Sequence, residues 1–323
     1  MAYVDRPIIN TRNNRMKIVF VLNPIAGGSS ARRKRQRLIE ALTVSDLEYE
    51  IRYTEHRCHA SQIARAAAEA GHAVVAVGGD GTAHEVASGI MESGDDVPMG
   101  VLPTGTGNDF AKMLDVPDTL ETTLQSFQAG HCTRIDAGQI QWDGPTGAGM
   151  GNFINIGGTG FDAKVAAAAS SFKLLTGTLR YVVSVLGTLR SWEAPEASVK
   201  FSVGGDVVYS YTGRLFLVLA GNGVCSGGGF YLTPGASIID GMLDTCIIRD
   251  ISIFRVLTLM PAALRGNHGS AGEVTIERVE RVHIESKVPL PIQADGEILT
   301  QGATEIEIRV MPAALRILLP VRM

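Results

Sequence analysis

Residues 74–85 read VVAVGGDGTAHE, and this stretch decides the fold. Its apolar start is typical of a strand that is buried on both faces, as in a parallel sheet. Glycines around Asp80 and Thr82 then end the strand, and residues 83–91 are expected to be helical. Such a turn is a ready phosphate site, because backbone N–H groups and the helix dipole point the same way. Glycine lets the backbone approach an anion closely and adopt positive φ.

The turn differs from the common nucleotide-binding fingerprints. Counted from Gly79, the second glycine is Gly81, but His84 stands where the dinucleotide fingerprint has its third glycine. The sequence Gly-x-x-x-x-Gly-Lys-Ser/Thr does not occur in the chain. On this stretch alone, a tight turn without a ligand remains an alternative.

The composition favours two domains and no general affinity for polyanions. The chain has 323 residues, which is long for one domain, and 45% of them are hydrophobic, enough for a sizeable core. Lys and Arg number 29 against 33 Asp and Glu, a net charge of −4. This balance argues against a nucleic-acid partner, and any membrane contact must be local.

The sequence predicts a cytoplasmic protein. The cysteines (Cys58, Cys132, Cys225 and Cys246) are scattered and include no C-x-x-C pair, which favours reduced thiols over disulfides or a zinc site. Residues 1–15 are polar, so we expect a flexible leader rather than a signal peptide. No run approaches the ~18 consecutive apolar residues that a spanning helix needs.

Strand and helix patterns alternate in the first part of the chain. Strands are expected over residues 17–22, 48–53, 74–77 and 98–102, and helices over 31–42, 59–70 and 83–91. This rhythm is typical of a doubly wound parallel sheet, in which loops at the carboxyl ends of the strands bind ligands.

Short strands predominate after about residue 130, with helical stretches at residues 163–192 and 254–264. The expected strands are 133–141, 151–157, 198–203, 206–212, 214–220, 241–249, 274–277, 281–285, 292–294 and 304–310. Many short strands with turn signals between them predict an antiparallel sandwich or barrel.

Two more loops follow strands of the predicted sheet. Asn23-Pro24 opens the first, and an ordinary turn and a nucleotide-lining loop are equally compatible with it. The second, residues 103–111, reads PTGTGNDFA and lies beside the 78–82 turn if both strands share one sheet. There Asn108 could be a turn residue and Asp109 a helix N-cap. Paired with Asp80, Asp109 instead suits Mg²⁺, which prefers oxygen ligands and bridges phosphates.

These motifs, taken in order, resemble a known family. The GGDGT turn is similar to a signature shared by diacylglycerol and sphingosine kinases, NAD kinases and phosphofructokinases. With Asn23-Pro24 and PTGTGNDFA, the chain resembles the bacterial soluble diacylglycerol-kinase and sphingosine-kinase superfamily. NAD kinases and phosphofructokinases share only this first part. Later segments match in order: residues 157–161 (GGTGF), Gly221-Asn222, residues 227–229 (GGG), Pro234, Asp240-Gly241 and Asp295-Gly296-Glu297.

The resemblance implies the domain organisation. Residues 16–132 and 311–323 would form an N-terminal α/β ATP-binding domain with a doubly wound parallel sheet like that of NAD kinases and diacylglycerol kinases. The segment from Met311 is assigned there because it resembles the family's final strand. Residues 133–310 would form a β-rich antiparallel sandwich that takes the lipid substrate, and the nucleotide cleft would lie between the domains.

The resemblance also implies an ATP site. Thr54 belongs to this implied site, and its alternative reading is an ordinary residue at the end of a strand. His84 departs from the asparagine usual in the family, and we interpret it as a hydrogen-bond donor in place of the amide rather than as a base. The implied residues are Asn23, Pro24, Ile25, Ala26, Gly27, Thr54, Gly78, Gly79, Asp80, Gly81, Thr82, Ala83, His84, Glu85 and Thr106.

Carboxylates are the implied catalytic groups. Glu297 is the expected general base, because a lipid hydroxyl is a poor nucleophile and a carboxylate within reach can take its proton. Asp80 and Asp109, with Mg²⁺, would position the phosphoryl group and neutralise its charge. Asp136 matches a family position that helps hold metal and water. A plain D-G hairpin turn is the alternative reading of Asp295-Gly296-Glu297.

A second Mg²⁺ site is implied beside Asp240. Its ligands would be the Asp240 carboxylate and the main-chain oxygens of Ser237 and Met242. A simple turn at Asp240-Gly241 is the alternative.

On the acceptor side, residues 172–189 are strongly apolar with Lys173, Arg180 and Arg190 around them. A core helix and a lipid-facing lid both fit this pattern, on different faces.

We therefore expect an ATP- and Mg²⁺-dependent lipid kinase that phosphorylates the hydroxyl of diacylglycerol or a related lipid alcohol. It would meet its substrate at the membrane surface through peripheral contact. The sequence leaves open which lipid is the acceptor and which oligomeric state the protein adopts, a homodimer included. Two alternatives are a kinase of a soluble acceptor, such as NAD or a sugar phosphate, and a nucleotide-binding regulatory protein with little turnover.

Overall fold

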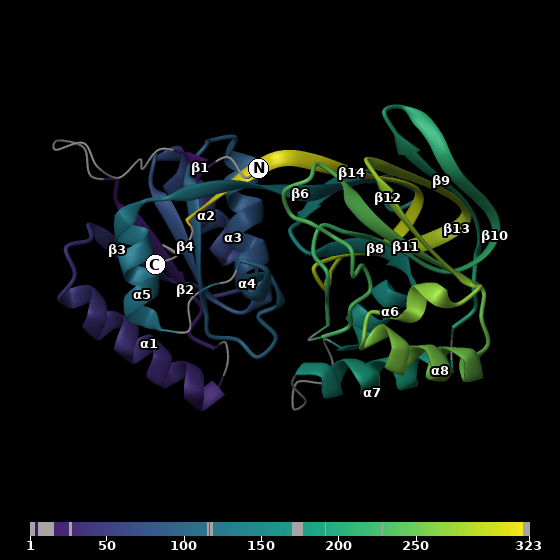
Figure 1. Ribbon diagram of the computed structural model, residues 1–323, viewed down its shortest axis with the longest axis horizontal. Coiled ribbons are helices and arrows are strands. Elements are labelled where there is room, and N and C mark those ends of the chain that lie inside the picture. The colour runs from purple at the N-terminus through teal and green to yellow at the C-terminus, as the bar shows by residue number, and fades with distance from the viewer. Residues whose placement is uncertain are drawn as a thin grey trace. The chain divides into compact units, whose positions relative to one another are not determined.

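The computed structural model divides into two compact units (Figure 1). Unit 1 comprises the described residues up to Ile135 and those from Ala313 onward, and unit 2 comprises Asp136 to Pro312. Apart from the short strand β1 (Val4–Asp5), the predicted leader lies outside the described residues. The structure describes residues 4–5, 16–25, 28–114, 116, 119–169, 177–190, 192–227 and 229–318.

Unit 1 contains the predicted parallel sheet, in the order β3-β2-β4-β5-β14. Every residue of β2 and β4 is buried, as expected for strands that are covered on both faces. The strands are β2 (Ile18–Leu22), β3 (Tyr49–Tyr53), β4 (Ala73–Gly78), β5 (Pro98–Pro103) and the last residues of β14 (Glu297–Leu318). β1 pairs antiparallel with the start of β6 (Cys132–Asp143).

Helices cover both faces of this sheet (Figure 1). On one face, α1 (Gly28–Thr43) and α5 (Leu120–Ala129) bury Leu38, Leu42 and Phe127 in a cluster with Phe20 and Val75. On the other face, α2 (His59–Glu69) and α3 (Asp80–Ser93) pack against each other and against β4. The short helix α4 (Asp109–Met113) follows β5.

Unit 2 is a β-sandwich of antiparallel strands, as predicted. The order along one path is β12-β11-β10-β8-β13-β14, while β9 pairs with the first halves of β10 and β13 and β8 with their second halves. The long strands β10 and β13 thus take part in both layers of the sandwich. The remaining bounds are β7 (Gly149–Phe153), β8 (Ile156–Gly160), β9 (Glu196–Val203), β10 (Asp206–Gly221), β11 (Leu243–Arg249), β12 (Val274–Val279) and β13 (Arg281–Ala294).

Three helices pack on one side of this sandwich. They are α6 (Phe161–Ala169), α7 (Gly177–Leu189) and α8 (Ile253–Ala263), and a 3₁₀ turn (His268–Ser270) follows them. Their buried side chains, such as Val165, Leu189 and Leu259, share one apolar cluster with Phe216. Within the described ranges, no helix is long and apolar enough to cross a membrane.

Several predicted element boundaries are wrong. Residues 206–212 and 214–220 form one strand, because Gly213 stays paired opposite Ala197. Residues 281–285 and 292–294 are likewise joined in β13, and 304–310 extends to β14. Conversely, residues 151–157 are split at Ile154-Asn155, and α3 begins at Asp80 instead of residue 83. Short-range patterns miss such features because distant partners decide them.

The close packing of α2 on α3 depends on Gly89. A Cβ there would lie 2.2 Å from the Ser61 carbonyl oxygen. We expect Gly89→Ala to lower the free energy of unfolding by about 1–3 kcal/mol through overpacking. Urea denaturation would measure the change.

The matched control is Gly187→Ala in α7, where a Cβ would meet no atom of the described residues within 4 Å. This change should stabilise the protein by about 0.5–1 kcal/mol, because it removes only the entropic cost of glycine in a helix. Equal effects of the two substitutions would contradict the packing argument.

Candidate functional site

The predicted phosphate-binding turn lies at the switch point of the unit 1 sheet. The strand order reverses between β2 and β4, and the helices that follow them, α1 and α3, cover opposite faces. Open α/β sheets bind ligands at the carboxyl ends of their strands at such a point. The loops after β2 and β4 therefore flank the expected position of a ligand.

The GGDGT turn is a tight entry into α3. Gly79 is the N-cap residue with φ −99° and ψ −167°, and its carbonyl accepts hydrogen bonds from Thr82 N (3.0 Å) and Ala83 N (3.1 Å). Gly78, Gly79 and Gly81 do not adopt positive φ, so the expectation that this turn uses glycine for its positive φ is wrong. Close packing accounts for two of them: a Cβ on Gly78 would lie 2.2 Å from Thr82 Oγ1, and one on Gly79 would lie 3.3 Å from the Gly105 Cα, whereas one on Gly81 would meet no described atom within 4 Å.

The loop after β5 is joined to this turn by backbone contacts. Thr104 N and Gly105 N donate to the Gly78 carbonyl at 2.8 and 3.2 Å. A Cβ on Gly105 would stand 2.5 Å from the Gly79 Cα. Asp80 Oδ1 accepts a hydrogen bond from Phe110 N at 3.0 Å. The structure thus brings the two loops together, as the shared sheet predicts.

Asn108 and Asp109 have separate local roles. Asn108 takes the left-handed conformation (φ 54°), and its amide both accepts from Gly105 N and donates to Gly105 O. Asn108, and not Asp109, is the N-cap residue of α4. Asp109 is buried and pairs with Lys112, with Nζ 3.1 Å from Oδ1.

Residues of the first and second loops lie beside the turn. Asn23 Nδ2 donates to Thr82 Oγ1 at 3.4 Å, and Asn23 Oδ1 accepts from Ile25 N. Thr54 is buried after β3 and donates its N–H to Leu22 O. Pro24 and Ile25 are exposed, whereas Ala26 and Gly27 lie outside the described residues. Thr106 is exposed in the loop after β5.

Glu85 holds the start of α2. Its Oε1 accepts from Cys58 N at 3.1 Å and its Oε2 from Ala60 N at 3.0 Å. A carboxylate at a helix N-terminus satisfies free N–H groups and the helix dipole. His84, the preceding residue, is buried, with only 8% of its surface exposed. Glu85 thus has a structural role that the sequence pattern did not indicate.

In unit 2, Asp295-Gly296-Glu297 forms the hairpin turn between β13 and β14. Asp295 (φ 51°) and Gly296 (φ 85°) both have positive φ, and Ala294 pairs with Glu297, as in a type I′ turn. The Asp295 carboxylate accepts hydrogen bonds from the N–H groups of Ile154, Asn155 and Ile156 at 2.8–3.0 Å. The carboxylate thus fixes the turn, and Glu297 follows it half-buried at the start of β14.

A buried polar chain supports this hairpin. Gln293 Oε1 accepts from Gly296 N at 2.8 Å, and Gln293 Nε2 donates to Asp162 Oδ2 at 2.8 Å. Both side chains are over nine-tenths buried. Neither residue stood out in the sequence; the only available signal was the position of Asp162 directly after GGTGF.

Asp136 joins the predicted catalytic and metal segments of unit 2. It is buried, its Oδ2 accepts from Gly241 N at 2.7 Å, and its N–H donates to Ile238 O at 2.6 Å. Asn222 Nδ2 donates to the Asp136 and Ile154 carbonyls. The buried amide oxygens of Asn155 and Asn222 have no hydrogen-bond partner among the described residues. Such oxygens suit a hydrated cation, so this region fits the metal-holding role expected of Asp136.

The Asp240 loop already has protein partners. Asp240 Oδ1 accepts from Met242 N at 3.1 Å, and its Oδ2 lies 3.6 Å from Arg278 Nη1. Arg278 also contacts Asp244, whose pKa burial raises above its usual value against the opposing effect of the arginine. Ser237 and Met242 flank the loop half-buried. In the described part of the chain, no group of three or more His, Cys, Asp or Glu side chains could hold a metal ion.

The predicted apolar segment is only partly described. Residues 172–176 lie outside the described residues, and α7 covers 177–189. Val185 and Leu189 are buried in the helix-side core, and Leu186 is 50% exposed. One face of α7 therefore packs on the core.

We expect Glu85→Ala to act mainly on stability. Loss of the α2 cap should lower the free energy of unfolding by about 1–2 kcal/mol. The matched control is Glu92→Ala, an exposed glutamate on the same helix, which should change it by less than about 0.5 kcal/mol. Equal unfolding midpoints for the two variants in urea would contradict the capping role.

Comparison with protein families agrees with this architecture. Residues 17–140 match the diacylglycerol kinase catalytic domain, and residues 156–319 match the YegS C-terminal NAD kinase beta sandwich-like domain. The chain is 33% identical over 242 residues to a protein of Chromohalobacter salexigens named "Probable lipid kinase YegS-like", covering 73% of each chain. It is 28% identical over 309 residues to a diacylglycerol kinase of Mycobacterium tuberculosis, covering 94% of this chain and 95% of the other.

Solved structures show the same fold at low sequence identity. A diacylglycerol kinase structure from Bacillus anthracis has a TM-score of 0.65 and 18% identity, covering 94% of this chain and 96% of that one. Yeast NADH kinase in complex with NADH has a TM-score of 0.52 and 12% identity, covering 98% and 88%. Both domain matches and the relatives lead to one conclusion: the chain belongs to the diacylglycerol kinase family and is a lipid kinase.

Proposed function

We propose that this protein transfers the γ-phosphate of ATP to the hydroxyl of diacylglycerol or a closely related lipid alcohol, with Mg²⁺. The observation that carries the proposal is the GGDGT turn, joined at the sheet's switch point to the loop after β5. The choice of acceptor is supported by relatives that are named diacylglycerol kinase.

Unit 1 supplies the nucleotide site in this proposal. The N–H groups at the start of α3 and the helix dipole favour the phosphates of ATP. Asn23, Thr54 and Thr106 stand at the carboxyl ends of neighbouring strands and line the rest of the nucleotide. Asp80 has a positioning role as well, because it holds the N-terminus of α4 through Phe110 N.

Mg²⁺ would be held by the carboxylates of Asp80 and Asp109 together with the phosphates, with Asp136 helping to hold metal and water. Protein Mg²⁺ sites of this type use one or two carboxylates plus substrate phosphates. When bound, the ion neutralises the charge that develops on the phosphoryl group. Lys112, which pairs with Asp109, limits how that carboxylate turns.

Glu297 is the proposed general base. Its carboxylate takes the proton of the lipid hydroxyl as that oxygen attacks the γ-phosphorus and ADP leaves. The hydrogen bonds of Asp295 and Gln293 support this role, because they hold the turn before Glu297 in one conformation.

A second ion at Asp240 would be structural. It would use the Asp240 carboxylate and the main-chain oxygens of Ser237 and Met242, and it would compete with Arg278 for that carboxylate. Asp136 supports this proposal, because its hydrogen bonds to Gly241 and Ile238 hold the Asp240 loop in place.

The protein works in the cytoplasm and meets its lipid by peripheral contact with the membrane surface. Exposed apolar side chains of unit 2 support that contact: Phe254 of α8 is 81% exposed, Leu257 41%, and Leu186 of α7 50%. Aromatic and leucine side chains on an exposed helix face are typical of interfacial membrane binding. A homodimer is compatible with this proposal, and the proposed chemistry uses residues of one chain.

The test is transfer of radiolabelled phosphate from ATP to lipid alcohols in mixed micelles. The panel contains diacylglycerol, a sphingoid base, phosphatidylglycerol, a prenol, NAD and a sugar phosphate. We expect Mg²⁺-dependent labelling of diacylglycerol, and a loss of about 10²–10⁴-fold in Glu297→Ala from removal of the base.

The matched control is Glu305→Ala, an exposed glutamate on the same strand, which should retain activity. Asp80→Asn should lose activity without losing the fold, as judged by its urea midpoint. Labelling of NAD or a sugar phosphate instead of lipid would refute the lipid acceptor. Full activity of Glu297→Ala would refute the assignment of the base.

A further inference from the structure

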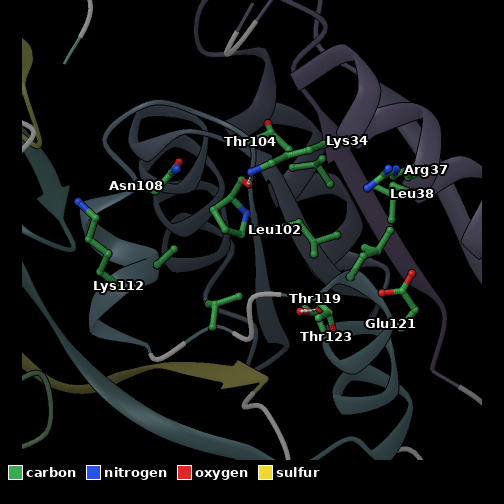
Figure 2. Close-up of a pocket in the computed structure, with 15 residues that line it drawn as sticks. Lys34, Arg37, Leu38, Leu102, Thr104, Asn108, Lys112, Thr119, Glu121 and Thr123 are labelled. Carbon is green, nitrogen blue, oxygen red and sulfur yellow. Dashed lines mark hydrogen bonds between the residues drawn. The ribbon is translucent and has the colours of Figure 1, made fainter. Parts of the chain in front are cut away.

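Unit 1 contains a cavity of about 500 Å³ on the face covered by α1 and α5 (Figure 2). This volume lies in the range of small-molecule sites, which is roughly 300–1,000 Å³. Residues of α1, of the ends of β4 and β5, of α4 and of the start of α5 line it. Figure 2 shows Lys34 and Arg37 reaching in from α1, with Thr119 and Thr123 on the α5 side.

The cavity is lined by other residues than the predicted nucleotide contacts that the structure describes. Of the implied ATP contacts among the described residues, from Asn23 to Glu85 and Thr106, none lines it. The two sites adjoin at Asn108, which lines the cavity and also holds Gly105 by paired hydrogen bonds. A ligand in the cavity would therefore touch the loop that supports the GGDGT turn without occupying the turn itself.

Apolar side chains form much of the lining. They come from α1, β4, β5, α4, α5 and the loop after α4, and they include buried Leu38, Val77 and Leu102. Leu120, Ala111 and Val116 extend the apolar surface. An apolar lining of this kind binds hydrocarbon by removing it from water.

Cationic and polar groups stand around this lining. Lys34 and Arg37 contribute two positive charges against one carboxylate, Glu121, among the lining residues, while Lys112 is paired with Asp109. Lys34 Nζ donates to Pro103 O at 3.4 Å, which directs the ammonium group toward the end of β5. Thr119, the N-cap residue of α5, places the positive end of that helix dipole at the same cavity. The excess of positive charge favours an anionic head group.

A buried hydroxyl also lacks a partner here. Thr104 lines the cavity and is 6% exposed, and its Oγ1 has no hydrogen-bond partner within the described ranges. Buried polar atoms in proteins are normally satisfied, but this oxygen has almost no accessible surface, so a ligand in the cavity would reach it only if the Thr104 side chain turned.

We propose that this cavity binds a small amphipathic anion, with its carboxylate or phosphate monoester near Lys34 and Arg37 and its short apolar chain over Leu38 and Leu102. A bare anion would leave the apolar lining in water, and a neutral lipid would leave Lys34 and Arg37 without an anionic partner in the cavity. The ligand class therefore needs both parts.

The test is isothermal titration calorimetry of the full chain with four probes below their micelle concentrations. Octyl phosphate and octanoate carry both parts, octanol lacks the charge and inorganic phosphate lacks the chain. We expect saturable binding of one or both amphipathic anions, with octanol and inorganic phosphate weaker by about tenfold or more. The relative affinities of octyl phosphate and octanoate decide which head group the cavity prefers.

The double variant Lys34→Ala/Arg37→Ala should weaken binding of the preferred anion by about tenfold or more, because it removes charge-assisted hydrogen bonds. The matched control is Arg32→Ala/Arg33→Ala, which removes the same charge from exposed positions of the same helix that do not line the cavity. It should leave binding within about twofold, since exposed charges at a distance are screened.

Saturating ADP separates this cavity from the nucleotide site. We expect the amphipathic anion to bind in its presence. The inference is overturned if ADP displaces the anion, if both double variants weaken binding equally, if inorganic phosphate binds as tightly as octyl phosphate, or if no probe binds. Failure of phosphate transfer to any lipid would leave this binding result standing, so the two proposals are tested separately.

Discussion

The backbones of two loops meet where β4 and β5 end, and the unit 1 site depends on that contact. A Cβ on Gly105 would stand 2.5 Å from the Gly79 Cα, and the Gly78 carbonyl accepts N–H groups from Thr104 and Gly105. The contact fixes the entry into α3, whose N–H groups face the phosphate position in the proposed mechanism. Asp80 strengthens it by holding the N-terminus of α4. This steric requirement explains the glycines at positions 79 and 105, where the two backbones meet.

Much of the fold could be predicted from the sequence. The parallel sheet follows from fully apolar runs such as residues 74–77, which require cover on both faces, and from helices of regular length between them. The sandwich follows from alternating runs after residue 130. Strand ends were less accurate: Gly213 reads as a break, yet it stays inside β10 because it is paired with Ala197 on the neighbouring strand. Pairing across a sheet compensates for a weak local preference, and a local pattern does not contain that information.

The candidate site, like the fold, could be predicted only in part. The loops of unit 1 could be located because their residues are contiguous in sequence and follow predicted strands. The roles of Glu85 and Asp295 could not, because each carboxylate binds N–H groups that are far away in the chain: Cys58 and Ala60 in one case, residues 154–156 in the other. The link between Asp136 and the Asp240 loop spans a similar separation. The cavity between α1 and α5 has no sequence signature at all, since it is a space left by packing.

The most direct measurement is the affinity of Gly105→Ala for ADP with Mg²⁺, made beside its urea unfolding curve. Gly105 does not adopt positive φ, so the added methyl group acts through close contacts: its Cβ would stand 2.5 Å from the Gly79 Cα and 2.9 Å from Asn108 Oδ1, within the same pair of loops. If the contact between the loops shapes the nucleotide site, the variant stays folded and its affinity falls by about tenfold or more, because small displacements of a binding loop are costly. Unchanged affinity in a folded variant would contradict the account.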